Sequence, residues 1–133
     1  MPLYRNSFVL LDVTVPTAAP QVGPAFRVRP SDGDGISDHD QQYRCLLDVQ
    51  RIGPGAAQAQ LWTSWDGIKW VPVAQVDVNG PEPQHFELLD LAAFGPFVQA
   101  RSTVFPANPG DPLPNHRATV RLASDGSFNL RPV

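Results

Sequence analysis

The chain has 133 residues, of which 42% are hydrophobic, and this is enough for one domain with one core. Charged residues make up 17% and the formal net charge is −3, so the composition offers no basic face for binding nucleic acid. The single cysteine, Cys45, excludes an intramolecular disulfide.

Proline and glycine, with 15 and 10 copies, divide the chain into short apolar runs. Such punctuation is typical of a β-sandwich or barrel. We predict one all-β domain over residues 1–133: an antiparallel two-sheet sandwich, jelly-roll-like, with eight or nine short strands. No apolar run approaches the ~20 residues of a membrane helix, and the first residues lack the pattern of a signal peptide. We therefore expect neither membrane association nor export by a signal peptide.

The N-terminal part predicts three strands, at residues 9–15, 25–29 and 42–52. In the third strand, apolar–polar alternation places Cys45, Leu47 and Val49 on the apolar side, and Asp48 and Gln50 on the polar side. We therefore expect Cys45 to be a buried and unreactive thiol. In the first strand, the same alternation predicts one buried face, formed by Val9, Leu11, Val13 and Val15.

An acidic loop separates the second and third strands, with the sequence Asp-Gly-Asp-Gly-Ile-Ser-Asp-His-Asp over residues 32–40. It resembles the calcium-binding loops of thrombospondin type 3 repeats, which carry Asp-x-Asp-Gly-x-x-Asp and supply several oxygens to a hard cation. An EF-hand loop would need an oxygen ligand at Ile36 and a glutamate at Tyr43. The alternative is a solvated Asp-Gly loop without metal. We predict no metal site and no cofactor, and leave open whether calcium binds Asp32, Asp34, Asp38 and Asp40.

Residues 58–74 hold all three tryptophans around the pair Asp66-Gly67. An Asp-Gly pair between strand-like runs predicts a tight hairpin turn with positive φ at the glycine. Pro72 predicts an edge strand or a bulge in the second arm. Alternation separates Trp65, which shares a side with Leu61, from Trp62. We expect one of these sides to be core, and packed tryptophans rather than a platform for stacking sugars.

The C-terminal half predicts strands at residues 85–89 and 97–105, with one helical turn at 90–94 between them. A loop with four prolines follows at residues 106–116. Residues 117–123 and 127–130 are expected to form a last hairpin around Asp125-Gly126.

No arrangement of residues predicts catalysis. His39, His85 and His116 lack the paired spacing of a metal site. No Gly-x-Ser-x-Gly occurs, and nothing in the sequence pairs Glu82 with Glu87 as acid and base. We predict that the protein is not an enzyme and has no catalytic residues.

Ser64-Trp-Asp-Gly-Ile-Lys-Trp70 resembles the Ser-x-Asp-Gly-x-x-Trp hairpin of small β-sandwich proteins from tailed phages, such as head decoration, head fibre and tail-associated proteins. Residues 95–101, Gly-Pro-Phe-Val-Gln-Ala-Arg, are similar to a Pro-Tyr-Val-Arg-Ala strand that often follows it. The resemblance implies a non-enzymatic structural protein of a virion, assembled in the host cytoplasm. It would bind and stabilise the capsid or tail, as a homo-oligomer.

Two contact surfaces follow from this interpretation: the proline-rich loop at residues 106–116 and the N-terminal residues 2–4, which could add a strand to a neighbouring sheet. The alternative function is a carbohydrate-binding β-sandwich module. A small jelly-roll enzyme would need a cluster of histidine and glutamate residues, which the sequence does not supply.

Overall fold

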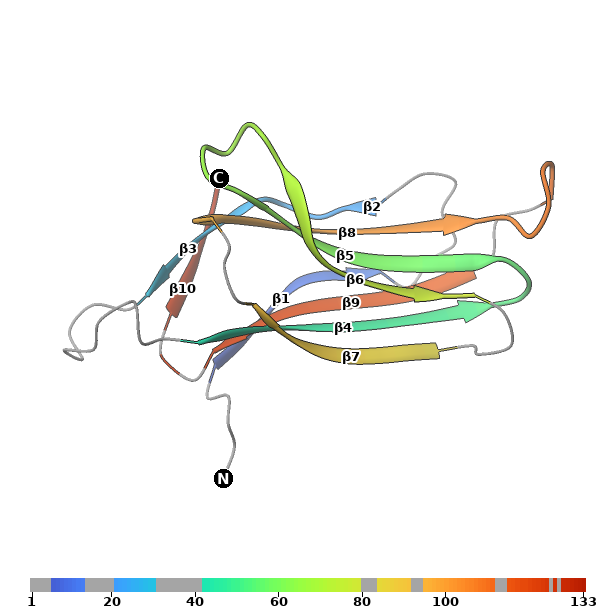
Figure 1. The fold of residues 1–133 in the computed structure, drawn as a ribbon, viewed down its shortest axis with the longest axis horizontal. Helices are drawn as coiled ribbons and strands as arrows, with labels where there is room; N and C mark the ends of the chain where they lie inside the picture. Colours follow the sequence, from blue (N-terminus) through green and yellow to red (C-terminus); the bar gives the residue numbers. More distant parts are fainter. Residues whose placement is uncertain are drawn as a thin grey trace, which may run out of the picture.

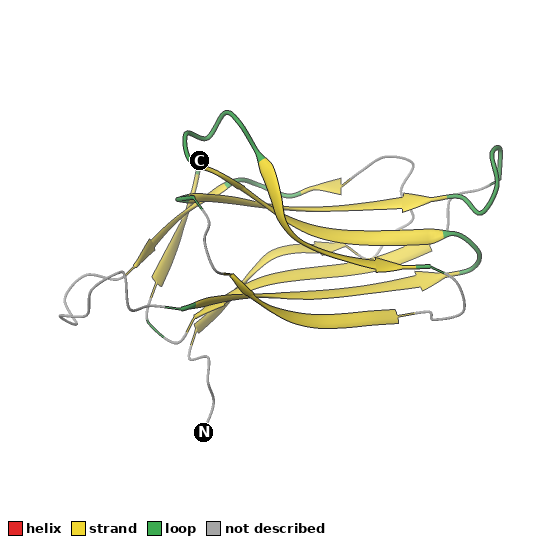
Figure 2. Ribbon diagram, viewed as in Figure 1, coloured by secondary structure: helices red, strands yellow, loops and turns green. Residues whose placement is uncertain are grey.

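The computed structural model describes residues 6–13, 21–30, 42–79, 84–91, 95–111, 115–124, 126 and 128–133. These residues form ten β-strands and no helix (Figure 2). None of them forms a helix long and apolar enough to cross a membrane. The strands are β1 (Asn6–Val13), β2 (Gln21–Val22), β3 (Phe26–Pro30), β4 (Tyr43–Ile52), β5 (Ala56–Ser64), β6 (Val71–Val78), β7 (Gln84–Leu91), β8 (Phe97–Phe105), β9 (Asn115–Ser124) and β10 (Phe128–Pro132).

The strands form two layers (Figure 1). One is a four-stranded sheet in the order β1-β9-β4-β7, and the other a six-stranded sheet in the order β10-β3-β8-β5-β6, with β2 paired to β8. All pairs are antiparallel. Without β2 and β10, the pairs β1–β9, β3–β8, β4–β7 and β5–β6 nest one inside the next, which is the jelly-roll order. The predicted sandwich is confirmed; the additional strand is the two-residue β2.

The core lies between the two sheets and is built by strict alternation in the central strands. In β4, Cys45, Leu47 and Val49 are fully buried, as predicted. They face Ala57, Ala59 and Leu61 of β5 and Val98 and Ala100 of β8 across the sandwich, together with Val120 and Leu122 of neighbouring β9. The predicted strand at residues 97–105 is likewise confirmed, and its small side chains make the inner face.

Register shifts explain one error and confirm one prediction. In β1 the register moves between Val9 and Leu11, so Leu10 is an extra residue that turns inward and Val9 is exposed. The predicted buried face is therefore wrong at Val9, because a bulge reverses the alternation on one side of it. In β6, Pro72 lies on an edge strand beside a second shift, as predicted.

The last predicted hairpin is wrong. β9 belongs to the four-stranded sheet, whereas β10 pairs with β3 in the other sheet. The Asp-Gly pair at residues 125–126 indicated a change of chain direction, but a turn signal does not specify which strand the following segment pairs with. Asp125 itself lies outside the described residues.

Two further predictions need correction near β7 and β9. The helical turn at residues 90–94 is wrong at its start, because Asp90 and Leu91 belong to β7 and pair with Arg44 and Tyr43. The proline-rich loop is shorter than residues 106–116, since β9 begins at Asn115 and His116 is buried in it. Residues 92–94 and 112–114 are not among those described.

Candidate functional site

Two highly exposed apolar side chains lie on the loop between β5 and β6, residues 65–70, which we call the β5–β6 loop. Trp65 is 74% exposed and Ile68 80% exposed, and Val71 follows at the start of β6 with more than half of its surface free. Trp65 was predicted on the side of buried Leu61, but β5 ends at Ser64, so the alternation does not extend to Trp65.

Hydrogen bonds from one carboxylate fix the shape of this loop. Oδ1 of Asp66 accepts from the backbone N–H groups of Ile68 (2.8 Å) and Lys69 (2.9 Å) and from the Ser64 hydroxyl (3.1 Å). The N–H groups of Lys69 and then Ile68 lower the pKa of Asp66 below its usual value. Gly67 has φ of +78° and donates its N–H to the Ser64 hydroxyl at 2.8 Å.

The positive φ predicted at Gly67 is confirmed, but the turn is not a tight two-residue hairpin. Thr63 pairs with Val71, so seven residues, 64–70, connect the last paired residues of β5 and β6. The reason is that Asp66 bonds to the two residues after Gly67 and closes a wider loop than Asp-Gly hairpins usually make.

The base of the loop is held against the segment that enters β8. The Gly95 N–H donates to the Thr63 hydroxyl at 2.8 Å, and that hydroxyl donates to the Phe97 carbonyl at 2.9 Å. A Cβ at Gly95 would overlap the Ser64 carbonyl, so the backbones approach as closely as only glycine allows. Hydrogen bonds therefore hold the loop both at its base, through Thr63, and at its tip, through Asp66.

Trp62 lies on the outer face of the six-stranded sheet and has its own partners. The guanidinium carbon of Arg101 lies 4.0 Å from the centroid of the Trp62 ring, a cation–π contact. The indole N–H donates to the Gln60 side chain at 2.7 Å, and Gln60 donates to Gln75. Arg101 thus occupies one face of the Trp62 ring, and a sugar could not stack on that face.

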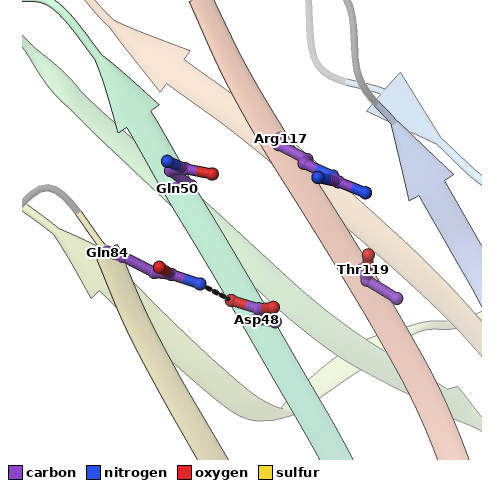
Figure 3. A pocket seen from close by; sticks show the side chains of 5 residues that line it. All are labelled: Asp48, Gln50, Gln84, Arg117 and Thr119. Carbon is purple, nitrogen blue, oxygen red and sulfur yellow. Dashed lines mark hydrogen bonds between the residues drawn. The ribbon is translucent and has the colours of Figure 1, made fainter.

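A shallow polar pocket of about 170 Å³ lies on the outer face of the four-stranded sheet (Figure 3). The Gln84 amide donates to Asp48 at 2.9 Å. A guanidinium, a hydroxyl and a second amide complete the lining. The pocket therefore offers hydrogen-bond donors and acceptors, together with one negative and one positive side chain. Its residues come from three adjacent strands: Gln84 of β7, Asp48 and Gln50 of β4, and Arg117 and Thr119 of β9.

Four titratable groups that sequence analysis singled out lie among the described residues: Cys45, His85, Glu87 and His116. Burial raises the pKa of Cys45 to about 12, which makes its thiol inert, as predicted. Burial lowers the pKa of His116, whose Nε2 lies 3.3 Å from the Ser102 hydroxyl. His85 lies beside Glu87, with Nε2 and Oε2 3.3 Å apart.

Among the residues that the structure describes, no three histidine, cysteine, aspartate or glutamate side chains gather as a metal site would require. His39, Glu82 and the acidic loop with Asp32, Asp34, Asp38 and Asp40 lie outside the described residues. For the acidic loop, the absence of a metal site therefore stays a prediction.

Sequence reasoning missed Ile68 and the polar pocket. Ile68 could have been noticed as an apolar residue directly after a turn glycine. The pocket was predictable only in part. Alternation placed Asp48 and Gln50 on the polar side of their strand. The positions of Gln84 and Arg117 beside them depend on the order of the strands in the sheet, which no local pattern encodes.

Comparison with known proteins adds no assignment: no protein family, no curated protein and no solved structure matches this chain.

Proposed function

We propose that the protein is a non-enzymatic structural component of a virion or phage-like particle, which docks on a capsid or tail protein through the β5–β6 loop. The observation that carries the proposal is the exposure of Trp65 and Ile68 on a loop that hydrogen bonds hold in one shape. The segment that presents them, residues 64–70, is also the segment that resembles the hairpin of phage β-sandwich proteins.

The physical argument rests on how protein interfaces gain affinity. Tryptophan is enriched at the few positions that contribute most of the binding energy, where it fills a desolvated pocket on the partner. A loop already fixed by Asp66 and Gly67 loses little conformational entropy on docking. A capsid or tail subunit with an apolar recess is the matching partner, and its binding would cover Trp65 and Ile68.

Co-sedimentation with shells assembled from the capsid protein of the proposed particle tests the proposal. Trp65→Ala should weaken binding about thirtyfold, the effect of losing a residue worth about 2 kcal/mol at an interface. Phe105→Ala is the matched control, since Phe105 is also an exposed aromatic residue but lies at the far end of β8 from the loop. Equal occupancy of the shells by Trp65→Ala and by the unmodified chain would remove the loop from the contact.

The polar pocket favours a second candidate, a carbohydrate-binding module. The Asp48 carboxylate accepts and the Arg117 guanidinium donates hydrogen bonds, and both kinds of group suit the hydroxyl groups of a neutral sugar. The negative charge of Asp48 disfavours an anion. Nuclear magnetic resonance titration with glucose, galactose, mannose and N-acetylglucosamine separates the two functions. Saturable shifts at Gln84 and Thr119 that Asp48→Ala abolishes would support sugar binding, and unchanged spectra at millimolar sugar would exclude these ligands.

A further inference from the structure

The strands at the ends of the two sheets differ in how they are protected against pairing with another chain. An unprotected edge is a template for a further strand, and proteins block it with proline, bulges or very short strands. Within the described chain, β1 has a register shift, β6 has Pro72 and a shift, and β10 is short and ends at Pro132. β7, the remaining end strand, has neither a proline nor a register shift, and its carboxylates are Glu87 and Asp90.

β7 is also regular along its whole length. It pairs with β4 without a break from Gln84 to Leu91, and no described strand pairs with its other side (Figure 1). Its outer face carries Phe86, 59% exposed, and Leu88, 38% exposed. An eight-residue edge with two exposed apolar side chains has both the free backbone groups and the apolar surface that strand addition uses.

We propose that β7 pairs antiparallel with β7 of a second copy of this chain, so that two four-stranded sheets join into one continuous sheet. Over residues 84–88, the side chains of β7 are self-complementary in one register. With the two-fold axis at Phe86, the two Phe86 rings lie opposite each other, and each His85 lies opposite Glu87 of the second copy.

The competing registers are less favourable. An axis at Glu87 places two carboxylates directly opposite each other, and an axis at Leu88 places Phe86 opposite Asp90. Aromatic pairs stabilise neighbouring strands, whereas like charges directly opposite destabilise them. The isologous pairing at Phe86 is therefore the one that the order of residues in β7 supports best.

This inference does not depend on the proposed docking function, because Trp65 and Ile68 lie on a loop of the other sheet. The sheet-to-sheet contact uses the edge of the four-stranded layer and leaves the β5–β6 loop free. Failure of one proposal would therefore leave the other standing.

Sedimentation velocity of the full chain, from about 1 to about 200 μM, tests the pairing. The unmodified chain should dimerise, and Phe86→Lys should be monomeric over this range, because lysine on an edge strand opposes strand addition. Ile68→Lys is the matched control: it places the same charge at a highly exposed apolar position away from β7, and it should dimerise normally. Thermal melting of each variant shows that the fold is retained.

A charge exchange tests the register. His85→Glu places carboxylates opposite each other twice in the dimer and should weaken dimerisation about tenfold. Adding Glu87→Lys to that variant places a lysine opposite each new glutamate and should restore the affinity. A chain that stays monomeric at all concentrations, or a dimer that Phe86→Lys leaves intact, overturns the proposal; a monomer that instead pairs β7 with a strand of another protein also overturns it. Insensitivity to His85→Glu overturns the register at Phe86.

Discussion

At the scale of single residues, His116 shows how a group chosen for possible chemistry becomes part of the core. The residue was expected in a loop, and the structure places it in β9 with almost no exposed surface. Its Nδ1 has no hydrogen-bond partner among the described residues, and its Nε2 lies near Ser102. A neutral imidazole fits this site, and a charged one would be poorly solvated there.

This burial predicts how stability changes with pH. The pKa of His116 is lowered in the folded protein, so below about pH 6.5 the unfolded chain takes up the proton more readily than the folded one. The free energy of unfolding should therefore fall as the pH is lowered from about 7.5 to about 5. Thermal melts of His116→Gln should show a flatter dependence than the unmodified chain.

His85→Gln is the matched control for this prediction. His85 is half exposed beside Glu87, and its replacement should leave the loss of stability on acidification in place. An equally steep pH dependence in His116→Gln and the unmodified chain would show that another group causes it.

At the scale of elements, the strands were predictable and their partners were not. Alternation placed Cys45, Leu47 and Val49 on one face of β4, and burial of that face confirms it. The Asp-Gly turn signal at residues 125–126 gave the wrong pairing, because β9 and β10 belong to opposite sheets. Pairing depends on contacts between residues far apart in the sequence, such as Cys45 with Leu122, and local periodicity carries no information about them.

The candidate site was predictable to a similar extent. Asp66-Gly67 correctly indicated a positive φ, which requires only local chemistry. The exposure of Trp65 was not predictable, because it depends on where β5 stops, and β5 stops at Ser64, whose carbonyl lies close to Gly95, a residue distant in the sequence.

Two glycines at this loop should respond differently to substitution. A Cβ at Gly67 would meet only the Phe97 ring at an ordinary 3.8 Å, so the cost of Gly67→Val comes from its positive φ. We expect a loss of about 1–2 kcal/mol. Gly67→Asn should lose less, since asparagine tolerates this conformation. Chemical denaturation of both variants measures the difference, and equal losses would contradict the conformational explanation.

Gly95→Ala is expected to destabilise the protein through overlap rather than through φ. The added methyl group would meet the Ser64 carbonyl, and the backbones of β5 and the segment before β8 must then separate. A loss of about 2–3 kcal/mol is typical of such overpacking. A loss smaller than that of Gly67→Asn would show that this close approach relaxes easily.

At the scale of the whole molecule, β10 holds the two sheets together at one end of the sandwich. Phe128 of β10 is buried, and its ring contacts two rings of the four-stranded sheet edge-on: Phe8 of β1 at 4.9 Å and Tyr43 of β4 at 5.4 Å between centroids. β10 itself pairs with β3 of the other sheet. The aromatic cluster of Phe8, Tyr43 and Phe128 therefore joins two separate hydrogen-bonded sheets.

Phe128→Ala should destabilise the domain by about 3–5 kcal/mol, the range for removing a buried phenylalanine. The loss combines the transfer of the ring to water, the cavity that remains and the lost edge-on contacts. Phe8→Ala removes only one of the two contacts, and the Phe8 ring is more exposed than the Phe128 ring, so the loss of stability should be clearly smaller. Phe105→Ala, at an exposed ring outside the cluster, should change stability by less than about 1 kcal/mol. Urea denaturation of the three variants gives the order, and a loss for Phe128→Ala no larger than that for Phe105→Ala would mean that the sheets are held together without β10.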